Sequence, residues 1–316
     1  MAVTDSIASE YATLTGACGL LDRSDRGKLA LAGAGAKEFL NGQVTNEVVA
    51  LQAGTGCYAA FLTNKGKMLG DLRVLDTGDE LLLDTERVAL QALFDLIRRY
   101  KIGYDVELHK RTLERSLLSL IGPDARSVAG AEGLPLSEHA HRHAVVGGQP
   151  VLLIATDAGV DVLCDAADAD AVAGALLEAG AVAVDEAAAE IVRVERGRPR
   201  YGVDLDEATI PQEAGLNERA VSFTKGCYVG QETVARLFYK GKPNRHLRGL
   251  RLSAPVRSGE DLHLGEKLVG HIGSSVVSPV HGPIALALVR REAAPGDTVE
   301  VGESAIRGIV AELPFS

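Results

Sequence analysis

One short segment holds side chains and glycines that a simple helix or strand would not select. It reads SFTKGCYVGQETVAR, from Ser222 to Arg236. Gly226 and Gly230 would each cost conformational entropy in a regular element, so another constraint must favour them. Lys225 lies two residues before Cys227, and its ammonium would lower the thiol pKa if both side chains faced one cavity. The pattern fits a reactive thiol, and it fits a small buried cysteine equally well.

Two acidic residues stand in patterns that suggest a ligand cleft. In LTNKGKMLGDLRVL, Asp71 shares one face of an alternating strand with Leu69 and Arg73. That arrangement fits an ion pair facing solvent, and it also fits an acid facing a cleft. Glu195 leaves a predicted helix in IVRVERGRPRYGVDLDEATIPQE, where charged and apolar residues alternate, so we expect it to point inward. A buried carboxylate must be paired or accept hydrogen bonds from a ligand, because its desolvation is costly.

Metal sites and disulfides are not indicated. His139, His141 and His143 in EHAHRH could share one strand face, but such collinear ligands do not surround an ion easily, and an exposed loop is favoured. The four cysteines are far apart in the sequence and form no CxxC motif: Cys18, Cys57, Cys164 and Cys227. Neither a disulfide framework nor a self-contained zinc site is therefore predicted.

Length and charge narrow the classes of function. The 316 residues exceed one average domain, which predicts two or three packed units. A net charge of −10 disfavours nucleic-acid binding through the whole surface. The segment from Lys225 to Arg251 contains seven Lys or Arg, forming either a solvated face or an anion-binding patch. The sequence shows neither a membrane-spanning apolar run nor a secretory signal, so the expected location is the cytoplasm.

The elements that position these residues form two similar halves. GDELLLDTERVALQALFDLIRR, from Gly78, and GVDVLCDAADADAVAGALLEAG, from Gly159, each predict a turn, a strand, an aspartate and a helix. Asp84 and Asp165 are the expected N-terminal caps of the two helices. Another strand candidate precedes each unit, so each half is predicted to be an α+β sandwich of antiparallel sheet and helices. The cleft between the halves is the expected ligand site.

The residue pattern of the sequence changes after Phe238. YKGKPNRH is a linker of Gly, Pro and basic residues, and the short strands that follow are separated by Gly, Pro and Asp turns. This pattern predicts a small antiparallel β-barrel of about 70 residues. The predicted boundaries are 1–240 for the N-terminal region and 245–316 for the barrel.

Four segments spread along the chain carry a further signal: GLLDRSDRGKLALAGAGAKEFLNGQVTNEV, NKGKMLGDLRV, VRVERGRPRYGVDLDEATIPQEAGL and VGHIGSSVVSPVHGPIALALV. In this order, and over nearly the whole chain, they resemble the family that includes the glycine-cleavage aminomethyltransferase, or T-protein, and the YgfZ folate-binding proteins. KGCYVGQE is the sharpest match, because it resembles the YgfZ signature. T-proteins usually carry an acid where Cys227 stands.

The resemblance implies an α+β fold of three lobes, with two interleaved ferredoxin-like N-terminal lobes, a C-terminal β-barrel and tetrahydrofolate, or a one-carbon derivative, in a central channel. Glu195 matches the glutamate that hydrogen-bonds the pterin ring, and Asp71 matches the aspartate that T-proteins use in one-carbon transfer. Tyr201 and Arg236 are further expected folate contacts. Cys227, tuned by Lys225, would contact a thiol, a sulfur species or iron.

Three functions are consistent with this resemblance. The first is a folate-dependent accessory protein for iron–sulfur cluster assembly or repair, whose partners are cluster-assembly proteins or cluster-containing clients such as tRNA-modifying enzymes. The second is an aminomethyltransferase of T-protein type. The third is a folate-binding module without turnover. Many YgfZ-like proteins lack the acid that matches Asp71, so its presence here keeps the transferase alternative open.

Overall fold

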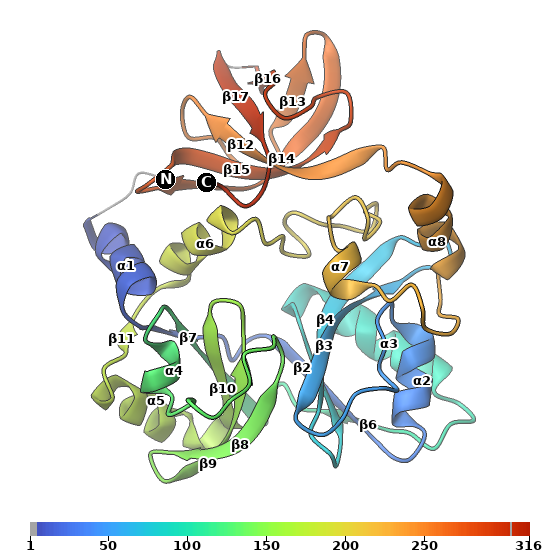
Figure 1. The fold of residues 1–316 in the computed structure, drawn as a ribbon, viewed down its shortest axis with the longest axis vertical. Coiled ribbons are helices and arrows are strands. Elements are labelled where there is room, and N and C mark those ends of the chain that lie inside the picture. Colours follow the sequence, from blue (N-terminus) through green and yellow to red (C-terminus); the bar gives the residue numbers. More distant parts are fainter. Residues whose placement is uncertain (1–4, 304) are drawn as a thin grey trace.

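The computed structural model describes residues 5–303 and 305–316. Figure 1 shows three lobes, two built on sheets and a third, at the top, formed by a barrel. The predicted α+β architecture of two sheet lobes and a C-terminal barrel is therefore confirmed.

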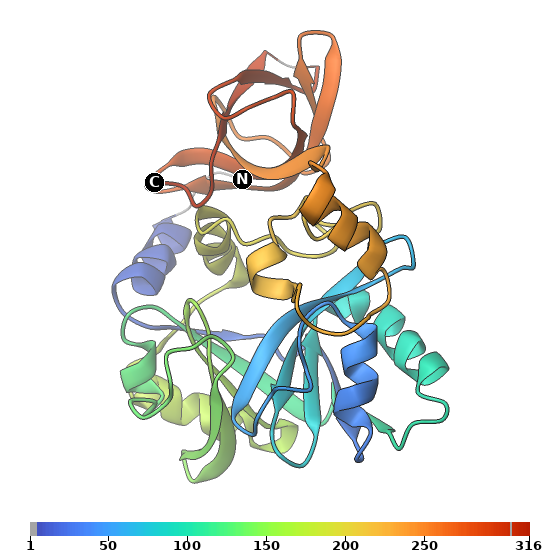
Figure 2. The same cartoon turned by 45° about the vertical axis from the view of Figure 1, so that its right-hand side comes forward.

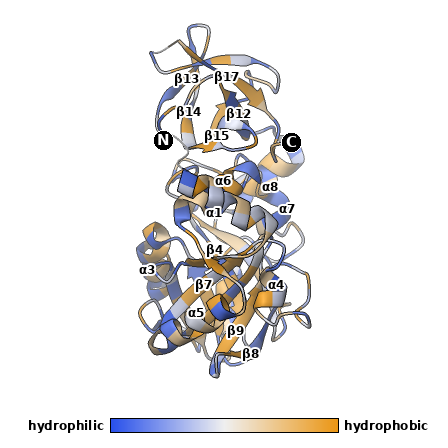
Figure 3. Cartoon of the chain, turned by 90° about the vertical axis from the view of Figure 1, so that its left-hand side faces the viewer, coloured by the Kyte–Doolittle hydropathy of each residue, from blue (hydrophilic) through white to orange (hydrophobic). Residues whose placement is uncertain are grey.

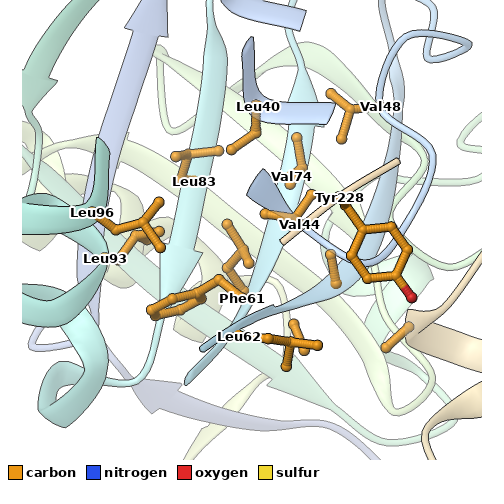
Figure 4. Packing of buried hydrophobic residues seen from close by; sticks show 14 of the residues in the cluster. Leu40, Val44, Val48, Phe61, Leu62, Val74, Leu83, Leu93, Leu96 and Tyr228 are labelled. Carbon is orange, nitrogen blue, oxygen red and sulfur yellow. The ribbon is translucent and has the colours of Figure 1, made fainter. Parts of the chain in front are cut away.

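The first lobe is a five-stranded antiparallel sheet in the order β3-β4-β5-β2-β6. Its strands are β2 (Gly27–Ala32), β3 (Thr55–Leu62), β4 (Met68–Asp76), β5 (Leu81–Thr85) and β6 (Glu107–Lys110). The helices α2 (Ala36–Gln43) and α3 (Leu90–Tyr100) pack on it through an apolar core. Figure 4 shows Phe61 and Leu83 of the sheet beside Leu93 of α3 in this core.

The second lobe is a six-stranded sheet in the order β11-β1-β7-β10-β9-β8. Its strands are β1 (Gly19–Asp22), β7 (Arg115–Ile121), β8 (His141–Val146), β9 (Gln149–Ala155), β10 (Gly159–Asp165) and β11 (Val182–Ala183). The helices α4 (Ala125–Val128) and α5 (Ala169–Glu178) pack on it. The pair β1–β11 is parallel, whereas the other strand pairs are antiparallel. Because β1 precedes every strand of the first lobe, the two lobes are interleaved along the chain.

The two sheets pack against each other through six buried side chains. Leu75 and Leu82 of the first lobe meet four apolar residues of the second: Leu117, Leu152, Ile154 and Leu163. This contact explains why β5 reads LLLDT and is buried along its whole length, since a strand covered on both faces needs no alternation.

The predicted duplication is confirmed, but its two capping aspartates are not. In each lobe a strand leads through a 3₁₀ turn, η1 (Arg87–Ala89) or η2 (Ala166–Asp168), into a helix. Asp84 lies inside β5. Asp165 ends β10 and occupies the N-cap position of η2, but it makes no side-chain capping bond, and neither do the residues that precede α3 and α5. The 3₁₀ turn moves the start of each helix several residues downstream, so Asp84 does not cap α3.

The C-terminal lobe is a closed barrel in the order β12-β15-β14-β13-β16-β17. Its strands are β12 (Arg245–Leu252), β13 (Asp261–Leu264), β14 (Lys267–Ser278), β15 (Gly282–Arg290), β16 (Thr298–Val301) and β17 (Ile306–Ala311). Figure 3 shows α1 (Asp5–Gly16) and α6 (Glu186–Glu195) between this barrel and the sheets. Figure 2 shows α7 (Asn217–Ala220) and α8 (Gln231–Lys240) beside the first lobe, on the path to the barrel. None of the helices in the described residues is long and apolar enough to cross a membrane.

Candidate functional site

A cavity of about 440 Å³ lies at the centre of the molecule, where both sheets approach α6 and the loop that follows it. Eight arginines and eight acidic residues contribute to its wall, so the charges of the lining nearly balance. Most of these arginines are already paired with carboxylates, as in the pairs of Arg23 with Glu186 and Arg219 with Glu138. The cavity therefore suits a polar ligand of mixed character better than a simple anion.

Asp71 faces this cavity from β4, as one of the two alternatives for its strand predicted. Its side chain is buried and accepts a hydrogen bond of 2.6 Å from the hydroxyl of Tyr58, on the neighbouring strand β3. Burial raises the pKa of Asp71 to about 6, although the Tyr58 hydrogen bond opposes the shift. A carboxyl group that changes charge near neutral pH is suited to holding or releasing a proton.

Replacing Asp71 with asparagine should stabilise the free protein at pH 7, by on the order of 2 kcal/mol. Because the folded-state pKa lies above the unfolded value, the folded state binds more protons between about pH 4 and 6, and wild-type stability falls as pH rises through that range. Asparagine removes the buried charge and can still accept the Tyr58 hydrogen bond. Urea unfolding of both proteins at pH 7 and pH 4 checks this, since the advantage of Asp71→Asn should disappear at the lower pH. If Asp71→Asn were still more stable than the wild type at pH 4, this expectation would be contradicted.

Arg73 does not pair with Asp71 but joins the two lobes next to the cavity. Its guanidinium contacts Asp84 of β5 and Asp161 of β10, each at 2.6 Å. Asp84 also accepts a bond of 2.9 Å from Arg26. Sequence reasoning missed Asp84 and Asp161 as members of this network. Their signal was present, because an acid inside an apolar strand such as LLLDT or GVDVL requires a buried partner.

Tyr201 and Glu195, both predicted folate contacts, lie in different surroundings. Tyr201 is buried in the cavity wall, and burial raises its pKa to about 12. Glu195 is not among the residues that line the cavity. Its carboxylate accepts hydrogen bonds from Tyr11 of α1, at 3.1 Å, and from Ser278 of β14, at 2.5 Å. It therefore points inward and is paired, as expected, but its partners are protein groups that connect α6 to α1 and the barrel.

The segment with Lys225 and Cys227 lies outside the cavity lining. Tyr228 packs into the core of the first lobe, beside Val44 in Figure 4. The buried ammonium of Lys225 donates to the carbonyl oxygens of Asn41, Val44 and Asn46, at 2.5, 2.8 and 2.9 Å. Lysine thereby caps the C-terminal end of α2, where carbonyls lack helical partners.

These contacts argue against the predicted tuning of Cys227 by Lys225. Each of the three ammonium protons has a carbonyl partner, and burial lowers the Lys225 pKa to about 8. The thiol with which Lys225 interacts electrostatically is that of Cys57. Cys227 itself is exposed, whereas the other three cysteines are partly or fully buried.

The glycines of this segment have different roles. Gly230 precedes α8 with a φ of 86°, and a Cβ there would lie 2.6 Å from the carbonyl oxygen of Thr63 in the β3–β4 turn. Glycine is thus required by both conformation and close approach. Gly226 has open space around it. Arg236 is exposed on α8 and does not line the cavity.

The basic residues between Lys225 and Arg251 do not form one surface. Lys225 is buried, Arg245 pairs with Glu213, and Arg248 pairs with Glu312. The two predicted alternatives, a solvated face or an anion-binding patch, therefore concern only the exposed basic side chains of this segment, such as Arg236.

The histidine motif is not the exposed loop that its sequence suggested. His139 and His141 are buried, and only His143 is exposed. His141 contacts two backbone carbonyl oxygens, those of His139 and Asp76, so it joins the second lobe to the first. The described residues contain no cluster of three or more His, Cys, Asp or Glu side chains suited to a metal ion.

Comparison with known proteins agrees with this architecture. Residues 1–225 match the GCVT N-terminal domain, and residues 245–315 match the glycine cleavage T-protein C-terminal barrel domain. A chloroplastic protein of Arabidopsis thaliana named as a transferase is 30% identical over 94% of this chain and 71% of its own length. The aminomethyltransferase of Streptomyces avermitilis is also 30% identical, over 97% of this chain and 88% of its own length.

A solved structure extends the agreement to three dimensions. The glycine cleavage system aminomethyltransferase T from Bartonella henselae superposes with a TM-score of 0.87 at 26% identity, covering 98% of this chain and 89% of that one. Two domain models in the order of the T-protein, with one fold along the whole length, place this chain in the GCVT aminomethyltransferase family.

Proposed function

We propose that this protein binds tetrahydrofolate, or a one-carbon derivative of it, in the central cavity. The observation that carries the proposal is the Asp71 carboxyl group, buried in the cavity wall and held by Tyr58. Family membership supports the choice of ligand, because the sequence resemblance assigns folate contacts to Asp71 and Tyr201, and both line the cavity. A volume of about 440 Å³ falls within the usual range for small-molecule sites.

The geometry suggests how Asp71 would act on such a ligand. Tyr58 donates to Oδ2, which fixes the orientation of the carboxyl group and leaves Oδ1 for the ligand. With its pKa raised to about 6, Asp71 is mostly ionised at neutral pH and can accept a proton from a nitrogen of the ligand. The balanced charges of the wall would orient the remaining polar groups of the folate.

For the cellular role, we propose maintenance of iron–sulfur clusters. The proposal is supported by KGCYVGQE, which resembles the YgfZ signature, and by the exposure of Cys227. Because Cys227 lies outside the cavity lining, its thiol could meet a cluster-assembly protein or client while folate occupies the cavity. Glycine cleavage is the alternative, which the cavity-facing Asp71 and the names of the similar aminomethyltransferases favour.

A deletion strain separates these two roles. We expect cluster-dependent enzymes to lose activity while growth on glycine as a one-carbon source is retained. Complementation by Asp71→Asn should be largely intact, whereas Cys227→Ser should fail. Normal cluster enzymes together with failed glycine cleavage would exclude the iron–sulfur role, and so would a null Asp71→Asn combined with a silent Cys227→Ser.

Folate binding is tested by calorimetry with tetrahydrofolate. If Glu195 contacts the pterin, as the resemblance implies, Glu195→Ala should weaken binding about ten-fold to a hundred-fold, because pterin donors would stay buried without a partner. Glu178→Ala, at an exposed position at the end of α5, is the matched control and should bind normally. Unchanged affinity in Glu195→Ala would leave Glu195 with the structural role that Tyr11 and Ser278 indicate.

A further inference from the structure

His139 holds a backbone conformation that most side chains avoid. Its φ is 70°, and among residues 5–303 and 305–316 it is the one residue other than glycine with a positive φ. The strain is maintained from both sides, since its amide donates to the Ala155 carbonyl at 2.8 Å and its own carbonyl contacts Nδ1 of His141 at 3.0 Å. Glycine would adopt this conformation with less strain, so the imidazole ring needs a separate explanation.

The ring is buried in the cavity wall without a hydrogen bond. His139 is 5% exposed and lines the cavity. Its Nδ1 has no partner, and the acid nearest its Nε2, Glu138, is 3.7 Å away, beyond hydrogen-bond distance. The neighbouring sheet leaves room for the side chain, because a Cβ on Gly56 would lie 3.0 Å from the Cβ of His139. A buried polar ring without partners destabilises a protein, which is a frequent sign of a functional site.

The surroundings of His139 keep the imidazole neutral. Burial, together with the charges of Arg73 and Arg219, lowers its pKa to about 4, while Glu138 opposes the shift. Glu138 is itself paired with Arg219. A neutral imidazole offers one N–H donor and one nitrogen acceptor. Because the ring carries no charge, it is suited to an uncharged group of the ligand.

We propose that His139 is a ligand-binding residue of the central cavity, where its neutral ring hydrogen-bonds an uncharged amide, amino or carbonyl group of the ligand. The inference rests on the proposed binding of folate, and it adds a residue from the second lobe to a site whose Asp71 and Tyr58 come from the first. Because Nδ1 is buried, bound ligand would meet the ring at Nε2, which no hydrogen bond engages, and the strained backbone would hold the ring in place.

Two substitutions separate the ring from the backbone. Glycine and asparagine both tolerate a positive φ, so His139→Gly removes the ring without straining the chain and His139→Asn leaves a shorter polar group. We expect calorimetry with tetrahydrofolate to show affinity about ten-fold weaker or more for His139→Gly, and an intermediate loss for His139→Asn. Without ligand, both variants should unfold at the same urea concentration as wild type or higher. The exposed His143, changed to asparagine, is the matched control and should bind normally.

The outcomes distinguish this inference from the proposed function. A wild-type protein that does not bind tetrahydrofolate would overturn the proposed function and this inference together. Wild-type binding with equal affinity for His139→Gly would overturn the inference alone. Loss of stability in both variants without ligand would also overturn it, since the ring would then be a packing residue.

Discussion

Replacing Asp84 with alanine is expected to lower the free energy of unfolding at pH 7 by about 3 to 5 kcal/mol, the largest effect that we predict for a single substitution. The buried carboxylate accepts bonds from Arg26 and Arg73. Without it, two guanidinium groups at the junction of the lobes lose a shared partner. Arg26 would still pair with Glu86, and Arg73 with Asp161, so these remaining ion pairs limit the loss of stability.

Asp165→Ala is the matched control, because Asp165 ends the corresponding strand of the duplicated unit. Its carboxylate pairs with Arg115, but the side chains are 56% and 39% exposed, so solvent screens the pair. We expect a loss below about 1 kcal/mol. Urea unfolding of both variants measures the difference, and equal losses would show that the buried network contributes no more than a surface ion pair.

The effect of Asp84 should depend on pH. Arg26 and Arg73 hold the pKa of Asp84 well below its usual range, although burial acts in the opposite direction. Because the folded-state pKa lies below the unfolded value, the stabilisation is fully present above about pH 4 and is lost as pH falls further. The gap between wild type and Asp84→Ala should therefore narrow in acid. A gap that stays constant from pH 7 to pH 3 would contradict this assignment.

Lys225→Met should lower the free energy of unfolding by about 3 kcal/mol, because the carbonyl oxygens of Asn41, Val44 and Asn46 would lose a charged donor. Methionine retains much of the apolar stem, so the loss reports on the ammonium. Lys240→Met, on the exposed end of α8, is the control and should change stability little. If the two variants are equally stable, the ammonium does not cap α2.

Alkylation of the cysteines tests the same assignment chemically. Limiting iodoacetamide at neutral pH should modify Cys227 first, since it is exposed, whereas burial raises the thiol pKa to about 11 in Cys18 and Cys164 and about 12 in Cys57. In a Lys225→Met variant that still folds, the alkylation rate of Cys227 should stay the same, because the Lys225 ammonium of the wild type binds backbone carbonyl oxygens and not the Cys227 thiol. If Lys225→Met selectively slowed the alkylation of Cys227, the result would support the electrostatic effect of Lys225 on Cys227 that the sequence suggested.

The local sequence was sufficient to predict the two α+β halves and the barrel, whereas the interleaving of the two N-terminal lobes was implied only by the family resemblance. Alternation, turn residues and the repeated strand–helix pattern predicted both sheet lobes and the barrel, because hydrophobic periodicity reflects which face of an element is buried. The resemblance carried by NKGKMLGDLRV and VRVERGRPRYGVDLDEATIPQEAGL pointed to the family that the domain matches show. It also directed attention to Asp71 and Tyr201, which the structure places in one cavity.

The partners of the charged side chains were decided only by the tertiary structure. Asp84 reads locally as a helix cap, yet it binds Arg26 and Arg73. Lys225 is two residues from Cys227 in sequence, yet its ammonium reaches three carbonyls near the end of α2. Sequence spacing determines which side chains share a face of one element, but it does not determine what another element places opposite them. Each buried charge loses its hydration on folding. It therefore needs a partner, and that partner is the group that the packed fold places within hydrogen-bond reach.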